Sequence, residues 1–110
     1  MTGNEYQTNV LNWNVDYPES LGAFCSTLKM QEEMGRLAST LLKVLNKKDG
    51  SITNKERDIF AIQLGEILAY LVRTMYHCGL TMDYVMQLNL DINAQKEEYN
   101  RIDRNNIFKK

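Results

Sequence analysis

Hydrophobic and polar residues recur along this chain with the period of an α-helix, from close to the N-terminus to about residue 101. Leu, Met, Glu, Gln and Lys are frequent and the chain has one proline, a composition that favours helix. The pattern predicts four helices, at about 4–13, 19–46, 54–78 and 82–101.

Local signals mark the ends of these helices. The residue before Pro18 is disfavoured in the helical region, which separates the first helix from the second. Thr53 and Glu56 have the spacing of a capping box, and Gly79 suits the left-handed end of the third helix. The first and fourth helices have their own candidate N-caps, Asn4 and Thr81. Because the connections are short, we expect the two long helices to lie antiparallel in an all-α four-helix bundle.

Length and charge limit the class of protein. With 110 residues, the chain forms one domain over 1–110, in which we expect residues after about 101 to fray. A net charge of −1 argues against a nucleic acid polymer or an anionic membrane as partner. Cys25 and Cys78 are isolated thiols, and the N-terminus has no signal-peptide pattern. We therefore expect a soluble cytoplasmic protein.

The second helix is amphipathic. A helical wheel gathers apolar residues on one broad face and polar residues in a sector of about 120°. The apolar face holds Leu37, Ala38, Leu41, Leu42, Val44 and Leu45, and the polar sector holds Lys29, Glu32, Glu33, Arg36, Ser39, Thr40 and Lys43. The simplest interpretation is that the polar sector faces water, with Arg36 paired to Glu32 or Glu33 at a gain of about 0.2–0.5 kcal/mol per pair.

The third helix is apolar almost all round, except for one polar stripe. The stripe steps by three and four residues through Gln63, Glu66, Tyr70, Arg73 and His77. In one interpretation it faces water or finds local partners. In the other, Gln63 and Glu66 lie opposite Glu33 and form a polar cleft between the antiparallel helices.

Two segments are similar to a known family. The runs KMQEEMGRLASTLLK (29–43) and QLGEILAYL (63–71) resemble the MazG-like all-α nucleoside triphosphate pyrophosphohydrolases, as do NEYQ near the start and CGLTMDYVMQLNLD (78–91). The resemblance covers about 4–96. It implies a helical bundle, a homodimer or homotetramer, and magnesium-dependent hydrolysis of an NTP or dNTP to the monophosphate and pyrophosphate.

The chain departs from the family pattern at the metal ligands. The pattern is E-E-x-x-E on one helix and E-x-x-D on the next, so its ligands fall on Glu33, Arg36, Gln63 and Glu66. Two acids and one arginine leave a formal charge of −1 where the pattern has −4. The resemblance implies Glu33, Gln63 and Glu66 as candidate Mg²⁺ ligands and Glu32, Glu33 and Glu66 as candidate catalytic residues.

Further positions are candidates for substrate binding. Arg36 either binds phosphate directly, since a guanidinium forks well onto it, or only neutralises a vestigial site. Asn89 stands where the family has a phosphate-binding Asn, but the Lys that the family has three residues later is replaced by Ile92. Asn93 and Lys96 have the same spacing one turn later. The remaining candidates are Lys43 and Trp13, the latter either stacking on a base or packing.

Three functions follow from these residues. The chain is an active pyrophosphohydrolase with an atypical metal site, a non-catalytic family member that binds nucleotide or a partner, or a helical assembly module.

Overall fold

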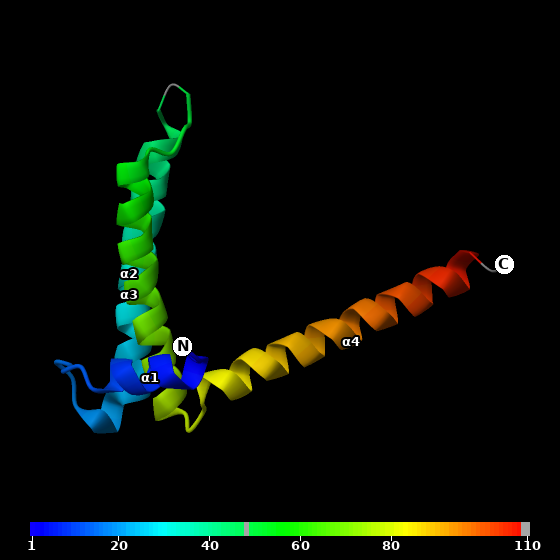
Figure 1. Cartoon of the computed structure of the whole chain (residues 1–110), viewed down its shortest axis with the longest axis horizontal. Helices are drawn as coiled ribbons and strands as arrows, with labels where there is room; N and C mark the ends of the chain where they lie inside the picture. Colours follow the sequence, from blue (N-terminus) through cyan, green and yellow to red (C-terminus); the bar gives the residue numbers. More distant parts are fainter. Residues whose placement is uncertain (48, 109–110) are drawn as a thin grey trace.

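The computed structural model describes residues 1–47 and 49–108, with residues 102–108 described by their backbone only. Its elements are α1 (Gly3–Leu11), the 3₁₀ turn η1 (Glu19–Leu21), α2 (Gly22–Leu45), α3 (Asn54–His77) and α4 (Met82–Phe108). All regular structure in the described residues is helical, which confirms the all-α prediction (Figure 1).

Helix ends follow the local signals, with one correction. The hydroxyl of Thr53 accepts from the Glu56 N–H at 3.2 Å, and the Glu56 carboxylate accepts from the Thr53 N–H at 2.9 Å, as the capping box predicts. Gly79 has a φ of 75° after the end of α3, which suits a residue without a Cβ. Asn4 is not the N-cap of α1: Thr2 caps this helix through its own capping box with Glu5.

Helices α2 and α3 form a long antiparallel hairpin, as predicted (Figure 1). Their facing residues make a seam that is polar at several levels. Gln63 donates to the hydroxyl of Thr40 at 3.0 Å, and the hydroxyls of Ser26 and Thr74 lie 2.7 Å apart. Closer to the α1 end, His77 lies so near Gly22 that a Cβ there would come within 2.2 Å of the ring.

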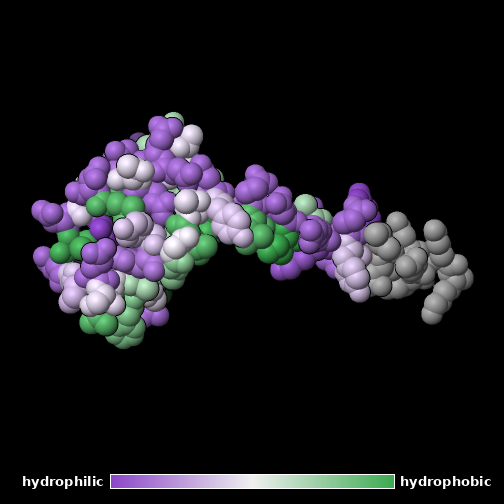
Figure 2. Space-filling model, turned by 90° about the horizontal axis from the view of Figure 1, so that it is seen from below, coloured by the Kyte–Doolittle hydropathy of each residue, from purple (hydrophilic) through white to green (hydrophobic). Residues whose placement is uncertain are grey.

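The polar sector of α2 is mostly exposed, as the simplest interpretation of the sequence predicts, but Glu33 and Thr40 turn toward the seam. Glu33, seven residues before Thr40 and on the same face, has a side chain only 15% exposed. The apolar face is divided: Val44 is only 4% exposed, whereas Leu42 is 60% exposed and Leu45 is 66% exposed. Hydrophobic side chains lie open both on the body of the molecule and along α4 (Figure 2).

The main buried cluster lies where α1 crosses α3. Val10, Ala69, Val72 and Met75 are buried there, and Tyr6, Leu68, Met82 and Val85 pack against them. Helix α3 is long and apolar enough to cross a membrane by length and composition. One such helix is weak evidence for a membrane span, because the core helix of a soluble protein meets the same criterion.

Helix α4 does not join the hairpin, so the predicted four-helix bundle is wrong for the single chain. The start of α4 is held against α1, where Asn4 and Asp83 exchange backbone-to-side-chain bonds of 3.3 and 3.0 Å. The helix then extends away from the hairpin (Figure 1), and every residue from 86 to 101 is exposed. The radius of gyration is 19.0 Å, against about 13 Å for a compact domain of this length.

Candidate functional site

Glu33, Arg36 and Gln63 are joined by a chain of hydrogen bonds across the hairpin. The Arg36 guanidinium donates to the Glu33 carboxylate at 2.8 Å. One turn on, the Thr40 hydroxyl donates to the Arg36 carbonyl oxygen at 2.9 Å and accepts from the Gln63 amide at 3.0 Å. The i,i+3 pair of Glu33 with Arg36 confirms one of the two pairings expected from the sequence.

The Gln63 amide is oriented by this network. The Thr40 hydroxyl donates its hydrogen to the Arg36 carbonyl oxygen, so toward Gln63 it can act only as an acceptor. The NH₂ group of Gln63 must therefore face Thr40, and this leaves its carbonyl oxygen Oε1 buried without a hydrogen-bond partner. A buried acceptor left unpaired costs about 1–3 kcal/mol. The position thus suits a donor or cation brought by a ligand.

Glu66 lies at the same level of the hairpin as Arg36. The contact between Thr40 and Gln63 fixes the register of the antiparallel helices. Arg36 lies four residues before Thr40, and Glu66 lies three residues after Gln63. Arg36 and Glu66 therefore lie at about the same height along the hairpin. Glu66 is exposed. Burial, and next the negative charge of Glu66, raise the pKa of the Tyr6 phenol. Tyr6 from α1 therefore lies within electrostatic range of Glu66.

The side chains at these positions do not fit the two-magnesium arrangement that the family resemblance implies. Mg²⁺ requires octahedral oxygen ligands and is held mainly by carboxylates and phosphate oxygens. Here the Glu33 carboxylate is already bound by Arg36, whose positive charge repels a second cation. Within 1–47 and 49–101, no three His, Cys, Asp or Glu side chains gather in a group able to hold a metal ion.

The other candidate residues are spread over the molecule. Glu32 is exposed and lies 3.9 Å from Lys29, which is a different partner from the Arg36 expected. Lys43 is exposed on α2. Asn89 and Lys96 both lie on the part of α4 that leaves the body, and Asn89 accepts from the Asn93 side chain at 2.8 Å. The remaining candidate, Trp13, lines a separate cavity with Arg73.

Sequence reasoning did not single out two residues that shape this site. Thr40 was grouped with the solvent-facing sector of α2, although its spacing of seven from Glu33 places both on one face. Tyr6 carried no signal beyond its place in the first helix. It comes near Glu66 because α1 crosses the hairpin, which is a long-range feature of the fold.

Comparison with known proteins gives one relative. The chain is 31% identical over 65 residues to the Gene 37 protein of Mycobacterium phage L5. The match covers 59% of this chain and 57% of that protein, so it spans little more than half of the relative's length. No family model matches the chain, and no solved structure matches it.

Proposed function

We propose that this chain is a MazG-like nucleotide-binding protein of the cytoplasm, in which Arg36 binds the phosphates of an NTP or dNTP directly and hydrolysis is impaired. The observation that carries the proposal is the pairing of Arg36 with Glu33 at the edge of the seam. Glu33 holds one guanidinium nitrogen at 2.8 Å, while the Arg36 side chain stays 67% exposed. Its other N–H groups have no protein acceptor among the described side chains and suit a phosphate.

Two neighbouring groups support nucleotide binding at this place. The unpaired Gln63 oxygen is an acceptor for a ligand hydroxyl or amino group. Tyr6 provides a phenol within electrostatic range of Glu66. A charge of −1 over the four ligand positions repels a triphosphate far less than the −4 of the family pattern would without metal.

Isothermal calorimetry with each common NTP and dNTP, with and without Mg²⁺, tests the proposal. We expect binding without metal, weakened about 10- to 100-fold by Arg36→Ala, because a charge-assisted hydrogen bond contributes about 1.5–3 kcal/mol. Arg57→Ala is the matched control, since it removes an exposed arginine from the far end of the hairpin. Equal affinities for the two variants would refute the role of Arg36.

A pyrophosphate-release assay on the same samples separates binding from catalysis. We expect no turnover with Mg²⁺ or Mn²⁺. Metal-dependent release that is lost in Glu33→Gln or Glu66→Gln would instead make this chain an active MazG-like pyrophosphohydrolase and overturn the proposed impairment.

We also propose that the chain assembles with copies of itself, as a homodimer or homotetramer. The exposed leucines of α2 are the observation that favours this, because Leu42 and Leu45 leave apolar surface uncovered on the single chain. Light scattering should give a mass above that of one chain. Leu45→Glu should shift it to the monomer, whereas Ser39→Glu, which adds the same charge at an exposed position, should not. A wild-type monomer at micromolar concentration would refute assembly.

A further inference from the structure

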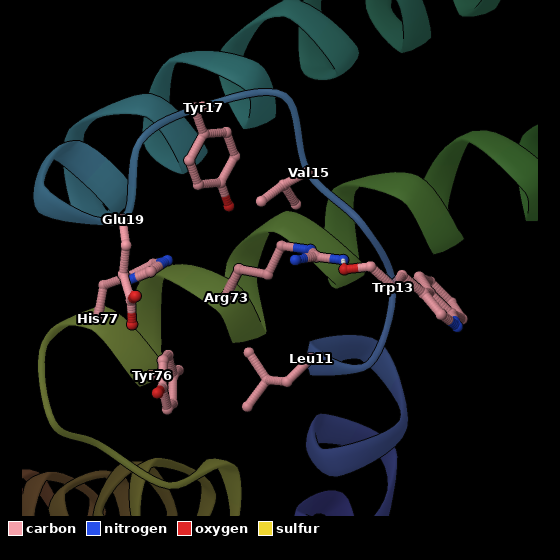
Figure 3. A pocket seen from close by; sticks show the side chains of 8 residues that line it. All are labelled: Leu11, Trp13, Val15, Tyr17, Glu19, Arg73, Tyr76 and His77. Carbon is pink, nitrogen blue, oxygen red and sulfur yellow. Dashed lines mark hydrogen bonds between the residues drawn. The ribbon is translucent and has the colours of Figure 1, made fainter.

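A second cavity lies away from the Arg36 site, between the loop after α1 and the C-terminal part of α3. Its volume is about 280 Å³, just below the range for small-molecule pockets, about 300–1,000 Å³. Apolar and aromatic side chains make its walls, and Glu19 stands on one side beside His77 (Figure 3). Arg73, seven residues beyond Glu66 on α3, forms part of its lining.

Arg73 is a buried cation without a carboxylate partner. The residue is only 6% exposed, and the ion pairs of the described side chains all join other residues. Its Nη2 donates to the carbonyl oxygens of Val10 at 2.8 Å and Trp13 at 3.3 Å, at the C-terminal end of α1. These bonds use one of three nitrogens. A buried guanidinium with unused donors is costly unless an anion completes its hydrogen bonding.

The other two guanidinium nitrogens open into the cavity. Nε and Nη1 have no acceptor among the described residues, yet they are not among the side-chain atoms sealed from solvent without a partner. Since Arg73 is otherwise buried, the cavity is the space they can reach. The hydrogens of Nε and Nη1 point in different directions, so each offers a separate charge-assisted hydrogen bond to an anion in the cavity.

Tyr17 adds a second donor without a partner. Its hydroxyl is buried and makes no hydrogen bond, and it points toward the interior of the cavity (Figure 3). The ring packs edge-on to His77, with centroids 6.1 Å apart, and His77 in turn packs edge-on to Tyr76 at 5.3 Å. The three rings supply apolar surface of the kind that a planar ligand contacts.

We propose that this cavity binds a small aromatic carboxylate, whose anionic group is held by Arg73 and the Tyr17 hydroxyl and whose ring lies among the aromatic walls. The cavity volume limits the ligand to about the size of one substituted ring. This site is independent of nucleotide binding at Arg36.

Isothermal calorimetry on the full chain measures this binding directly. Benzoate should bind in a saturable way, with a dissociation constant of about 1 mM or tighter for so small a ligand. Benzamide has the same shape without the charge and should bind at least about tenfold more weakly. Equal affinities for the two probes, or no saturable binding, would overturn the proposal.

Tyr17→Phe distinguishes a binding role from a structural one. Arg73→Ala would also remove the two bonds to the carbonyl oxygens of Val10 and Trp13, whereas Tyr17→Phe removes a hydroxyl that makes no hydrogen bond. The variant should keep or raise the melting temperature, since it removes an unpaired buried polar group. It should also weaken benzoate binding about fivefold or more. Tyr84→Phe, an exposed tyrosine on α4, is the matched control. Unchanged benzoate affinity in Tyr17→Phe would refute the proposed site.

Discussion

Gln7 joins three separate parts of the chain, and its removal should destabilise the fold more than any surface change. The side chain is buried. Its Nε2 donates to the carbonyl oxygens of Val72 at 3.1 Å and Leu80 at 3.2 Å, and its Oε1 accepts from the Met82 N–H at 3.0 Å. One glutamine therefore ties α1 to α3, to the turn after α3 and to the first residue of α4.

The size of the effect follows from these three bonds. At about 1 kcal/mol each, Gln7→Ala should lower the free energy of unfolding by about 3 kcal/mol. At about 4 °C per kcal/mol for a chain of this length, the melting temperature should fall by about 12 °C. Thermal unfolding followed by circular dichroism measures this. Amide hydrogen exchange at Met82, whose N–H loses its acceptor, should show the local opening at the start of α4.

A matched control and a charged variant test the reasoning. Gln31→Ala changes an exposed glutamine of α2 and should stay within about 0.5 kcal/mol of wild type. If Gln7→Ala unfolds with the Gln31→Ala midpoint, the three bonds do not stabilise the fold as argued. Gln7→Glu directs a carboxylate oxygen at two carbonyl oxygens, which raises the pKa of the new carboxyl in the folded state. That variant should be most stable below the unfolded carboxyl value of about 4.3 and should lose stability as pH rises above it.

Other predictions concern the hairpin and its site. Gly22→Ala places a Cβ 2.2 Å from the imidazole packed against it and should cost about 1–3 kcal/mol in chemical denaturation; an unchanged midpoint would show that the imidazole moves aside freely. Glu66→Gln should lower the pKa of Tyr6, measured by NMR titration of its ring, while burial keeps that pKa above 10.0; no change would place Glu66 away from Tyr6. A hydrogen bond from Lys47, then those of the capping box, lower the pKa of Glu56 from 4.5 to about 2. The stability it contributes is therefore present above pH 4.5 and lost as pH falls toward 2, and a Glu56 carboxyl that titrates near 4.5 by NMR would contradict this.

Helix ends were predictable because their signals are local. The capping box of α3 and the left-handed Gly79 depend on residues within one turn of each other. The same rule explains the error at α1. Thr2 and Glu5 have capping-box spacing too, so the true N-cap was readable from the sequence, and Asn4 instead binds Asp83, which is distant in the chain.

The direction that each helix face takes was not predictable from the period alone. An apolar stripe on a helix indicates that another surface covers it, but the sequence of the stripe does not identify that surface. On α2 the side facing α3 combines the buried Val44 with Ser26 and Thr40, which find partners there, and leaves Leu42 and Leu45 outward. Helix α4 diverges for a related reason: its contacts are made by its first turns against α1, and nothing in its later periodicity ties it to the hairpin.

Contacts of the candidate site residues were predicted correctly where both partners lie on one helix, and missed where the partners lie on two helices. The pairing of Glu33 with Arg36 follows from a spacing of three. The polar stripe of α3 divides in the folded chain, because Gln63 lies in the seam while Arg73 turns to the carbonyl oxygens of α1. Neither interpretation of that stripe predicted both the place of Gln63 in the seam and the bonds of Arg73 to α1. The bonds of Arg73 depend on the position of α1.

The two proposed properties of α2 occupy opposite sides of the helix, and this makes them separable. Leu45 lies nine residues beyond Arg36, a rotation of about 900°, which is half a turn after two full ones. A second copy that covers the leucine face therefore leaves Arg36 accessible, and a nucleotide bound at Arg36 does not need that copy. Leu45→Glu should consequently abolish assembly while leaving the nucleotide affinity measured by calorimetry unchanged, and Arg36→Ala should do the reverse. A joint loss of both properties in either variant would mean that the site is completed across the interface between copies.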